Sequence, residues 1–112
     1  MEDWLGQLRT TDKIILVEGR KDQAALEAVG VRNARALDGP LYEVVEELER
    51  RGKPVILLVD LDKEGKKLYH TLKHHLQRHG VKVDTSFREY LFAHTTLTNI
   101  EGIEHYLQRH PF

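Results

Sequence analysis

Two groups of acidic residues stand out because each directly follows a run of apolar residues. Glu18 follows Ile14–Val17, and Asp60 and Asp62 follow Val55–Val59. Carboxylates that come after neighbouring parallel strands meet at one edge of the sheet, where open α/β folds bind their ligands. We therefore expect Glu18, Asp60 and Asp62 to converge in one crevice.

Three converging carboxylates repel one another and lose hydration, and a divalent cation offsets that cost. Mg²⁺ is expected, with Mn²⁺ as a substitute, because Mg²⁺ prefers one or two carboxylates together with waters and phosphate oxygens. Asp60 and Asp62 reach one metal only if the chain bends, and Gly65 at the start of a helix allows such a bend. Glu18 either completes the metal shell or acts as a general acid or base. The alternative is structural: Asp62 caps the following helix, and Glu64 occupies a first-turn position that the helix dipole favours.

Strands alternate with helices along the chain, which indicates βαβ units and a parallel sheet. The fold class is therefore α/β, a three-layer α/β/α sandwich of about four mainly parallel strands in the order 2-1-3-4. We expect one domain over residues 1–112, with a core at 13–84 and a C-terminal helical segment at 87–109, where Asn99 caps a last helix from Ile100 to Gln108. Strands are predicted at 14–17, 34–37, 55–59 and 81–84, and helices near 4–8 and at 21–29, 41–51 and 64–79, while 87–107 is expected to be mostly helical.

Composition excludes several classes of protein. The chain has no cysteine, so disulfides, zinc–thiolate sites and thiol catalysis are excluded. No apolar run approaches the length of a membrane span, and the acidic N-terminus lacks a signal-peptide pattern, so a cytoplasmic protein is expected. The net charge of −1 means that nucleic-acid binding would need a local basic patch.

The two acidic groups resemble the motifs of the Toprim family, which occurs in topoisomerases, bacterial primases, recombination proteins and small nucleases. The sequence Glu18-Gly19-Arg20-Lys21-Asp22 is similar to its first motif, and Asp60-Leu61-Asp62-Lys63-Glu64-Gly65 is similar to its second. The resemblance covers about residues 13–84 and is greatest for stand-alone Toprim proteins and the Toprim part of a bacterial ribosomal-RNA maturase. Nothing in the sequence resembles the large domains that topoisomerases and primases add, so strand passage and primer synthesis are not expected.

The resemblance implies a role for each matching residue. Glu18 corresponds to the family's general acid or base, and Asp60 and Asp62 to its Mg²⁺ ligands. Glu64 matches a third acid of the topoisomerase version. Supporting roles fall to the tight-turn glycines Gly19 and Gly65 and to Asp22 in the first turn of a helix.

Basic residues flank both motifs and are candidates for contacts with nucleic-acid phosphates; they are Arg20, Lys21, Lys63, Lys66 and Lys67. Four histidines between residues 70 and 79 form two i,i+4 pairs, but no third ligand accompanies them, so an ordinary helix face is favoured. No tyrosine is placed by a motif as a covalent nucleophile, which makes water the expected attacking group.

Three functions remain open from the sequence. The first is an enzyme, a Mg²⁺-dependent nuclease or nucleotidyl-transfer module acting on DNA or RNA. The second is an accessory module that grips nucleic-acid phosphate through Mg²⁺ while a protein partner supplies catalysis. The third is a small phosphatase with an Asp-x-Asp nucleophile. Exposed sheet edges also allow a dimer.

Overall fold

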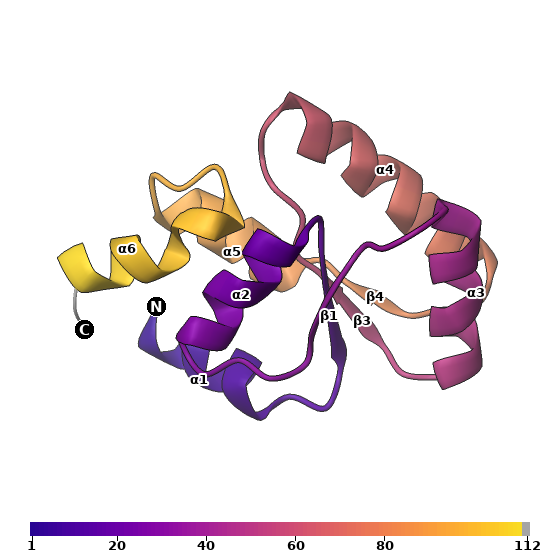
Figure 1. The fold of residues 1–112 in the computed structure, drawn as a ribbon, viewed down its shortest axis with the longest axis horizontal. Helices are drawn as coiled ribbons and strands as arrows, with labels where there is room; N and C mark the ends of the chain where they lie inside the picture. Colours follow the sequence, from indigo (N-terminus) through magenta and orange to yellow (C-terminus); the bar gives the residue numbers. More distant parts are fainter. Residues whose placement is uncertain (111–112) are drawn as a thin grey trace.

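Four short strands form the centre of the molecule, and helices cover both faces of the sheet (Figure 1). The computed structural model describes residues 1–110. Its elements are α1 (Glu2–Thr10), β1 (Ile14–Val17), α2 (Arg20–Ala28), β2 (Ala34–Ala36), α3 (Leu41–Arg51), β3 (Val55–Leu57), α4 (Lys63–Arg78), β4 (Val83–Asp84), α5 (Ser86–His94), the 3-10 helix η1 (Ile100–Gly102) and α6 (Ile103–Arg109).

The sheet has the order β2-β1-β3-β4, and all three pairs of strands are parallel. This confirms the predicted α/β class and strand order. The register places Ile15 beside Ile56 and Leu16 beside Leu57. Since β1 and β3 are neighbours that run in the same direction, the residues that follow them lie at the same edge of the sheet.

Alternation of side chains along β1 and β3 divides the core into two layers. Ile15 and Val17 point to a cluster shared with α1, α2, α5 and the C-terminal helices. Ile14 and Leu16 point to a second cluster shared with α3 and α4. The two clusters account for the continuous apolar runs in the sequence, because a strand covered on both faces needs apolar side chains on both sides.

Several element boundaries differ from the prediction. Leu58 and Val59 lie beyond the end of β3, yet both are buried and the Leu58 N–H donates to the Leu16 carbonyl at 2.9 Å. β4 is shorter than predicted. In the C-terminal region α5 ends at His94 and a turn follows, while η1, which leads into α6, begins at Ile100, where the last helix is predicted. That turn proves to be part of the candidate site.

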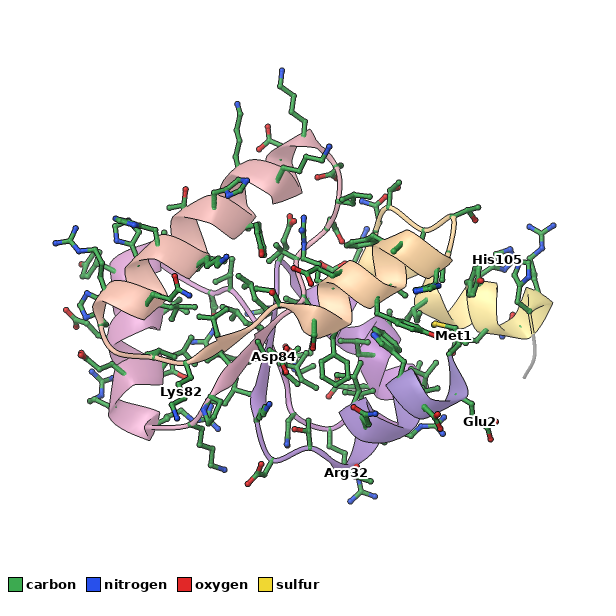
Figure 2. All side chains as sticks on the ribbon, turned by 180° about the vertical axis from the view of Figure 1, so that it is seen from behind. Met1, Glu2, Arg32, Lys82, Asp84 and His105 are labelled. Atoms are coloured by element: carbon green, nitrogen blue, oxygen red, sulfur yellow. The ribbon has the colours of Figure 1, made fainter. Side chains whose placement is uncertain are left out.

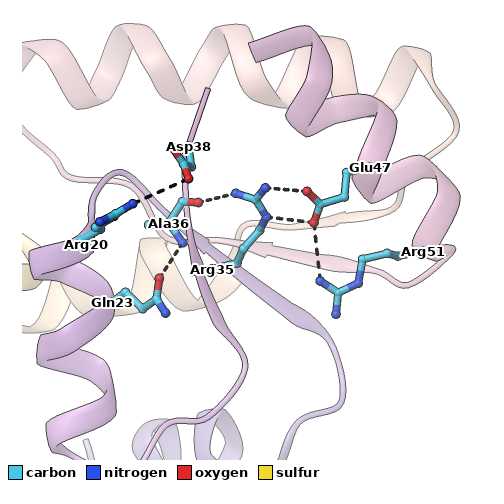
Figure 3. Close-up of polar contacts among 7 residues, drawn as sticks. All are labelled: Arg20, Gln23, Arg35, Ala36, Asp38, Glu47 and Arg51. Carbon is cyan, nitrogen blue, oxygen red and sulfur yellow. Dashed lines mark hydrogen bonds and ion pairs between the residues drawn. The ribbon is translucent and has the colours of Figure 1, made fainter. Parts of the chain in front are cut away.

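The edge strand β2 is fastened to helices on both sides by polar contacts (Figure 3). Arg35 on β2 pairs with Glu47 on α3, with 2.6 Å between Nη2 and Oε1. From the other side, Gln23 on α2 accepts the Ala36 N–H at 3.1 Å. Within residues 1–110, no helix is long and apolar enough to cross a membrane.

Candidate functional site

Glu18 and Asp60 meet where β1 and β3 end, as the sequence predicts. The Asp60 backbone N–H donates to Glu18 Oε1 at 3.1 Å. Gly65, in the first turn of α4, packs directly against both residues. A Cβ atom on Gly65 would lie 2.2 Å from the Asp60 carbonyl oxygen and 2.8 Å from Glu18 Oε1. Only glycine therefore allows α4 to begin so close to this pair.

Asp62 has the structural role that the alternative interpretation assigned to it. It is the N-cap of α4, and its Oδ1 accepts the Gly65 N–H at 2.8 Å. Its other oxygen, Oδ2, accepts a hydrogen bond from the Asn99 side-chain amide at 3.1 Å. Glu64 lies in the exposed first turn of α4, where a negative charge is favoured by the helix dipole.

Asp60 is buried, and both oxygens of its carboxylate have partners. Oδ1 accepts the Ile100 N–H at 2.8 Å, and Oδ2 accepts from the Asn99 amide nitrogen at 3.3 Å. Asn99 thus contacts Asp60 and Asp62 with one nitrogen atom. Asn99 does stand at the N-cap position of η1, but its side chain makes no capping hydrogen bond. Asn99 therefore stands at the predicted cap position without the capping bond, and its Oδ1, the atom that would cap, accepts from the Thr98 hydroxyl at 2.9 Å.

Arg88 on α5 supports the backbone at the end of β3. It is buried, and its Nε and Nη2 donate to the carbonyl oxygens of Val59 at 2.9 Å and Asp60 at 3.0 Å. Its guanidinium carbon lies 4.2 Å from the centre of the Tyr69 ring. Burial lowers the pKa of Arg88, although the charges of Asp60 and Glu18 oppose that shift. A buried cation beneath the acidic residues partly offsets their mutual repulsion.

Burial raises the pKa of two of the acids. The pKa of Glu18 lies above its ordinary value, first because burial removes hydration and next because Asp60 is close. The pKa of Asp22 is raised for the same two reasons. Asp22 also accepts the Gly19 N–H at 3.0 Å, which fixes the turn between β1 and α2. Gly19 and Asp22 therefore occupy the supporting positions that the sequence predicts.

All five predicted basic residues are exposed. Lys63, Lys66 and Lys67 belong to the first turns of α4, directly after Asp62. Arg20 and Lys21 begin α2, and the Arg20 guanidinium lies 3.8 Å from exposed Asp38 (Figure 3). The two helix starts that carry these cations follow the two acidic strand ends.

Sequence reasoning missed Arg88 and missed the contacts of Asn99 with Asp60 and Asp62. Both lie in the C-terminal region, outside the two motifs and far from them along the chain. An arginine within a helical pattern gives no signal of burial. Asn99 was noticed only as a cap, because Asn is a common N-cap residue.

The donor atoms at this edge suit a hard divalent cation. Asp60 Oδ2 and Asp62 Oδ2 both contact the same amide nitrogen, so both oxygens face the Asn99 amide group. Mg²⁺ is commonly held by one or two carboxylates. Within residues 1–110, no group of three or more His, Asp or Glu side chains is arranged to hold a metal ion. A third protein ligand would therefore have to be of another type, or Glu18 or Glu64 would have to move.

Comparison with known proteins defines the class to which this fold and site belong. The Toprim domain family matches residues 12–86, which include both acidic motifs and all four strands. The chain belongs to the Toprim family.

Its relatives are small proteins that it matches over most of their length. It is 32% identical to a UPF0292 protein of Methanocaldococcus jannaschii over 95% of this chain and 87% of that protein. It is 36% identical to a UPF0292 protein of Pyrococcus abyssi over 89% and 76% of the two chains. A solved structure of an Aquifex aeolicus protein superposes with a TM-score of 0.83, at 34% identity, and covers 90% of this chain and 95% of that one.

Proposed function

We propose that this protein carries out Mg²⁺-dependent phosphodiester chemistry on nucleic acid, as a nuclease or nucleotidyl-transfer module. The observation that supports this most is the contact between Glu18 and Asp60 at the joined ends of β1 and β3, with Asp62 two residues further on. Membership of the Toprim family suggests a metal-binding function related to nucleic acids.

Asp60 and Asp62 would hold the metal, which is Mg²⁺ or, in its place, Mn²⁺. Glu64 is the nearest further carboxylate along the chain. The bound cation would neutralise the charge of a phosphate and make its phosphorus more electrophilic. The two carboxylates keep the cation beside the start of α4, whose exposed lysines would hold neighbouring phosphates.

Glu18 would act as the general acid or base. Its raised pKa brings proton uptake and release closer to neutral pH than an ordinary glutamate allows. Its Oε1 accepts the Asp60 N–H, so the carboxylate is held in a defined position next to the metal ligands. Glu18 can therefore take a proton from water or give one to the leaving oxygen.

Water is the proposed attacking group. Tyr69 packs against the Arg88 guanidinium, and Tyr42 lies on α3, in the helical layer beside α4. Within residues 1–110, no tyrosine hydroxyl is hydrogen-bonded to Glu18, Asp60 or Asp62. Hydrolysis is thus favoured over a covalent protein–nucleic acid intermediate.

The accessory-module function keeps support from one observation. In the described residues no three acidic side chains form a ready metal cluster, so the site could grip phosphate without completing a catalytic shell. The phosphatase has less support. That architecture needs a further acid beside Asp60 and Asp62. Asp84 ends β4, but it is in register with Ile56, which comes before Asp60 along the chain, and it pairs with Lys13 at 3.2 Å.

A cleavage assay tests the proposal. The purified protein is incubated with labelled DNA and RNA, single- and double-stranded, with Mg²⁺, with Mn²⁺ or with chelator. We expect cleavage that needs the metal and is lost in Asp60→Asn and Asp62→Asn. The matched control is Asp12→Asn, an exposed aspartate that precedes β1 at the opposite edge of the sheet. Binding without cleavage of every substrate would favour the accessory module, and neither binding nor cleavage would contradict both.

A further inference from the structure

Asn99 joins the two carboxylates that are proposed to hold the metal. Its Nδ2 donates to Asp62 Oδ2 at 3.1 Å and to Asp60 Oδ2 at 3.3 Å. An amide nitrogen carries two hydrogens, so it can serve both acceptors at once. The family motifs do not include this position, because the match ends at residue 86.

Hydrogen bonds on both sides of Asn99 join its segment to the acidic loop, which is the loop after β3 that contains Asp60 and Asp62. On one side, the Leu61 N–H donates to the Thr98 carbonyl at 2.8 Å. On the other side, the Ile100 N–H donates to Asp60 Oδ1 at 2.8 Å. These two bonds fix the backbone on either side of Asn99, and this backbone position holds the amide group next to the carboxylates.

The distances match those between neighbouring ligands of one metal ion. Mg²⁺ binds six oxygens octahedrally at about 2.0–2.1 Å, so adjacent ligand oxygens lie about 3.0 Å apart. The amide nitrogen lies 3.1 and 3.3 Å from the two carboxylate oxygens. Each of these two spacings is close to that between adjacent ligands of one octahedral ion, but the amide nitrogen carries hydrogens and cannot bind a metal.

A half-turn of the amide group would replace that nitrogen with the amide oxygen, Oδ1, without moving the backbone. The hydroxyl of Thr98 can remain hydrogen-bonded to the amide group after such a turn. Thr98 Oγ1 donates to Asn99 Oδ1 at 2.9 Å, and a hydroxyl can equally accept from an amide nitrogen. The hydrogen bond to Thr98 would be kept with donor and acceptor exchanged.

We propose that Asn99 is a third protein ligand of the metal held by Asp60 and Asp62, and that it binds through Oδ1 after this half-turn. The inference rests on the proposed metal site. Without the metal, the amide donates to both carboxylates and keeps them together against their repulsion. With the metal, the same group supplies a neutral oxygen, which suits a site where further negative charge would be costly.

The opposing interpretation is that Asn99 only fills the place of the metal and is displaced by it. The two interpretations predict opposite effects of removing Asn99 on the affinity for the metal. A displaced residue competes with the metal, so its removal would tighten metal binding. A ligand assists the metal, so its removal weakens binding.

The test is calorimetry with Mn²⁺ on the wild type and on Asn99→Ala, together with the water-proton relaxation of the Mn²⁺ complexes. We expect Asn99→Ala to bind Mn²⁺ at least about tenfold more weakly, the lower end of the loss seen when groups that merely support a metal ligand are removed. We also expect stronger relaxation per bound ion, because a water takes the vacated position. The matched control is Asn33→Ala, since Asn33 donates to the Thr11 carbonyl at the opposite edge of the sheet.

Asn99→Asp is a second variant in case Asn99→Ala does not fold. We expect it to melt at a lower temperature than the wild type without metal, because three carboxylates then repel, and to gain more in melting temperature from Mn²⁺. Equal or tighter Mn²⁺ binding by Asn99→Ala would overturn the inference, and so would a smaller gain from Mn²⁺ in Asn99→Asp. In either case, weaker binding by Asp60→Asn would leave the metal site standing. A wild type that binds no Mn²⁺ would instead remove the metal site and the inference with it.

Discussion

Glu18, Asp60 and Asp62 each have a structural hydrogen bond as well as a proposed chemical role. Glu18 accepts the Asp60 N–H, Asp60 accepts the Ile100 N–H, and Asp62 caps α4 through the Gly65 N–H. For the two aspartates the oxygen that remains is the one shared with Asn99. The same backbone contacts that close the fold therefore aim these carboxylates, so capping and metal binding are compatible roles.

Glu18→Gln separates binding from catalysis. The substitution keeps an oxygen that can accept the Asp60 N–H and removes the carboxylate that exchanges a proton. General acid–base assistance contributes about 10²–10⁴ in rate, so we expect cleavage to fall by that factor. Nucleic-acid binding with Mg²⁺ should persist in a gel-shift assay. Glu27→Gln, an exposed glutamate near the other end of α2, is the control, and unchanged cleavage by Glu18→Gln would remove Glu18 from catalysis.

Gly65→Ala should damage the fold at the site itself. The added Cβ would meet the Asp60 carbonyl oxygen at 2.2 Å, which is backbone and cannot move aside cheaply. We expect a loss of at least about 2 kcal/mol in the free energy of unfolding, measured with urea.

Gly6→Ala is the control for this substitution. Gly6 also lies in a helix, but a Cβ there would meet nothing within 4 Å. Alanine should therefore stabilise the protein by about 0.5–1 kcal/mol, because it restricts the unfolded chain and favours helix. A Gly65→Ala protein as stable as the wild type would contradict the close contact between α4 and the acidic loop.

At the scale of residues, the motifs were sufficient to predict which acids meet, because strand polarity alone brings Glu18 and Asp60 together. Arg88 could not be predicted in the same way. Its burial depends on where α5 packs, and its two acceptors are main-chain carbonyls that no sequence pattern marks. The predicted metal, phosphate and catalytic roles of individual residues stay predictions.

At the scale of elements, the first turn of α2 contains Asp22, a carboxylate whose ionisation destabilises the fold. Burial and the charge of Asp60 raise the pKa of Asp22 above its unfolded value of 3.8. The folded protein therefore holds this proton more tightly than the unfolded chain does. The contribution of Asp22 to stability is fully present below pH 3.8 and is lost as the pH rises through the raised folded pKa.

Asp22→Asn should abolish this pH dependence while keeping an acceptor for the Gly19 N–H. We expect the metal-free variant to gain stability relative to the wild type as the pH rises from about 3 to 7. Urea unfolding in the presence of chelator measures the difference at each pH. A difference that stays constant over this range would show that the ionisation of Asp22 costs the fold nothing.

Glu47→Gln is a control of opposite sign. The hydrogen bond from Arg35 lowers the pKa of Glu47, so this stabilisation is present above the unfolded pKa of 4.5 and is lost as the pH falls through the folded pKa. The Gln variant should therefore be less stable than the wild type at neutral pH and approach it in acid. If the stability difference from the wild type changed with pH in the same direction for both variants, a general effect of charge would explain it.

The elements that the sequence predicts well are those with a long, regular pattern. The helix from Leu41 to Arg51 was predicted with the bounds that the structure has, and β1 was predicted likewise. The C-terminal region was predicted as mostly helical with a last helix from Ile100, and η1 begins there, but the end of α5 at His94 was not predicted. The break after α5 is set by tertiary contacts, because Thr98 and Ile100 bond to the loop after β3 instead of to a helix of their own.

At the scale of the whole molecule, the net charge is only −1, but the basic side chains are unevenly distributed. The starts of α2 and α4 carry exposed basic residues that follow the two acidic strand ends, and these are the side chains proposed to contact phosphates. Long-range attraction from the whole protein is weak, so a polyanion would be held by local contacts. Its binding should then depend steeply on salt and on a few side chains.

Single replacement of Arg20, Lys21, Lys63, Lys66 or Lys67 by Ala tests this distribution. A cation that contacts a phosphate displaces condensed counterions, so its loss should reduce the slope of log K against log salt by about 0.7 to 0.9. Arg20 should change the slope least, because Asp38 lies 3.8 Å from its guanidinium. Lys82→Ala is the control, since Lys82 precedes β4 and lies well away from the first turn of α4 (Figure 2). If the five slopes equal the wild-type slope and Lys82→Ala changes it, the polyanion binds at the opposite edge of the sheet, and Glu18, Asp60 and Asp62 have no part in holding it.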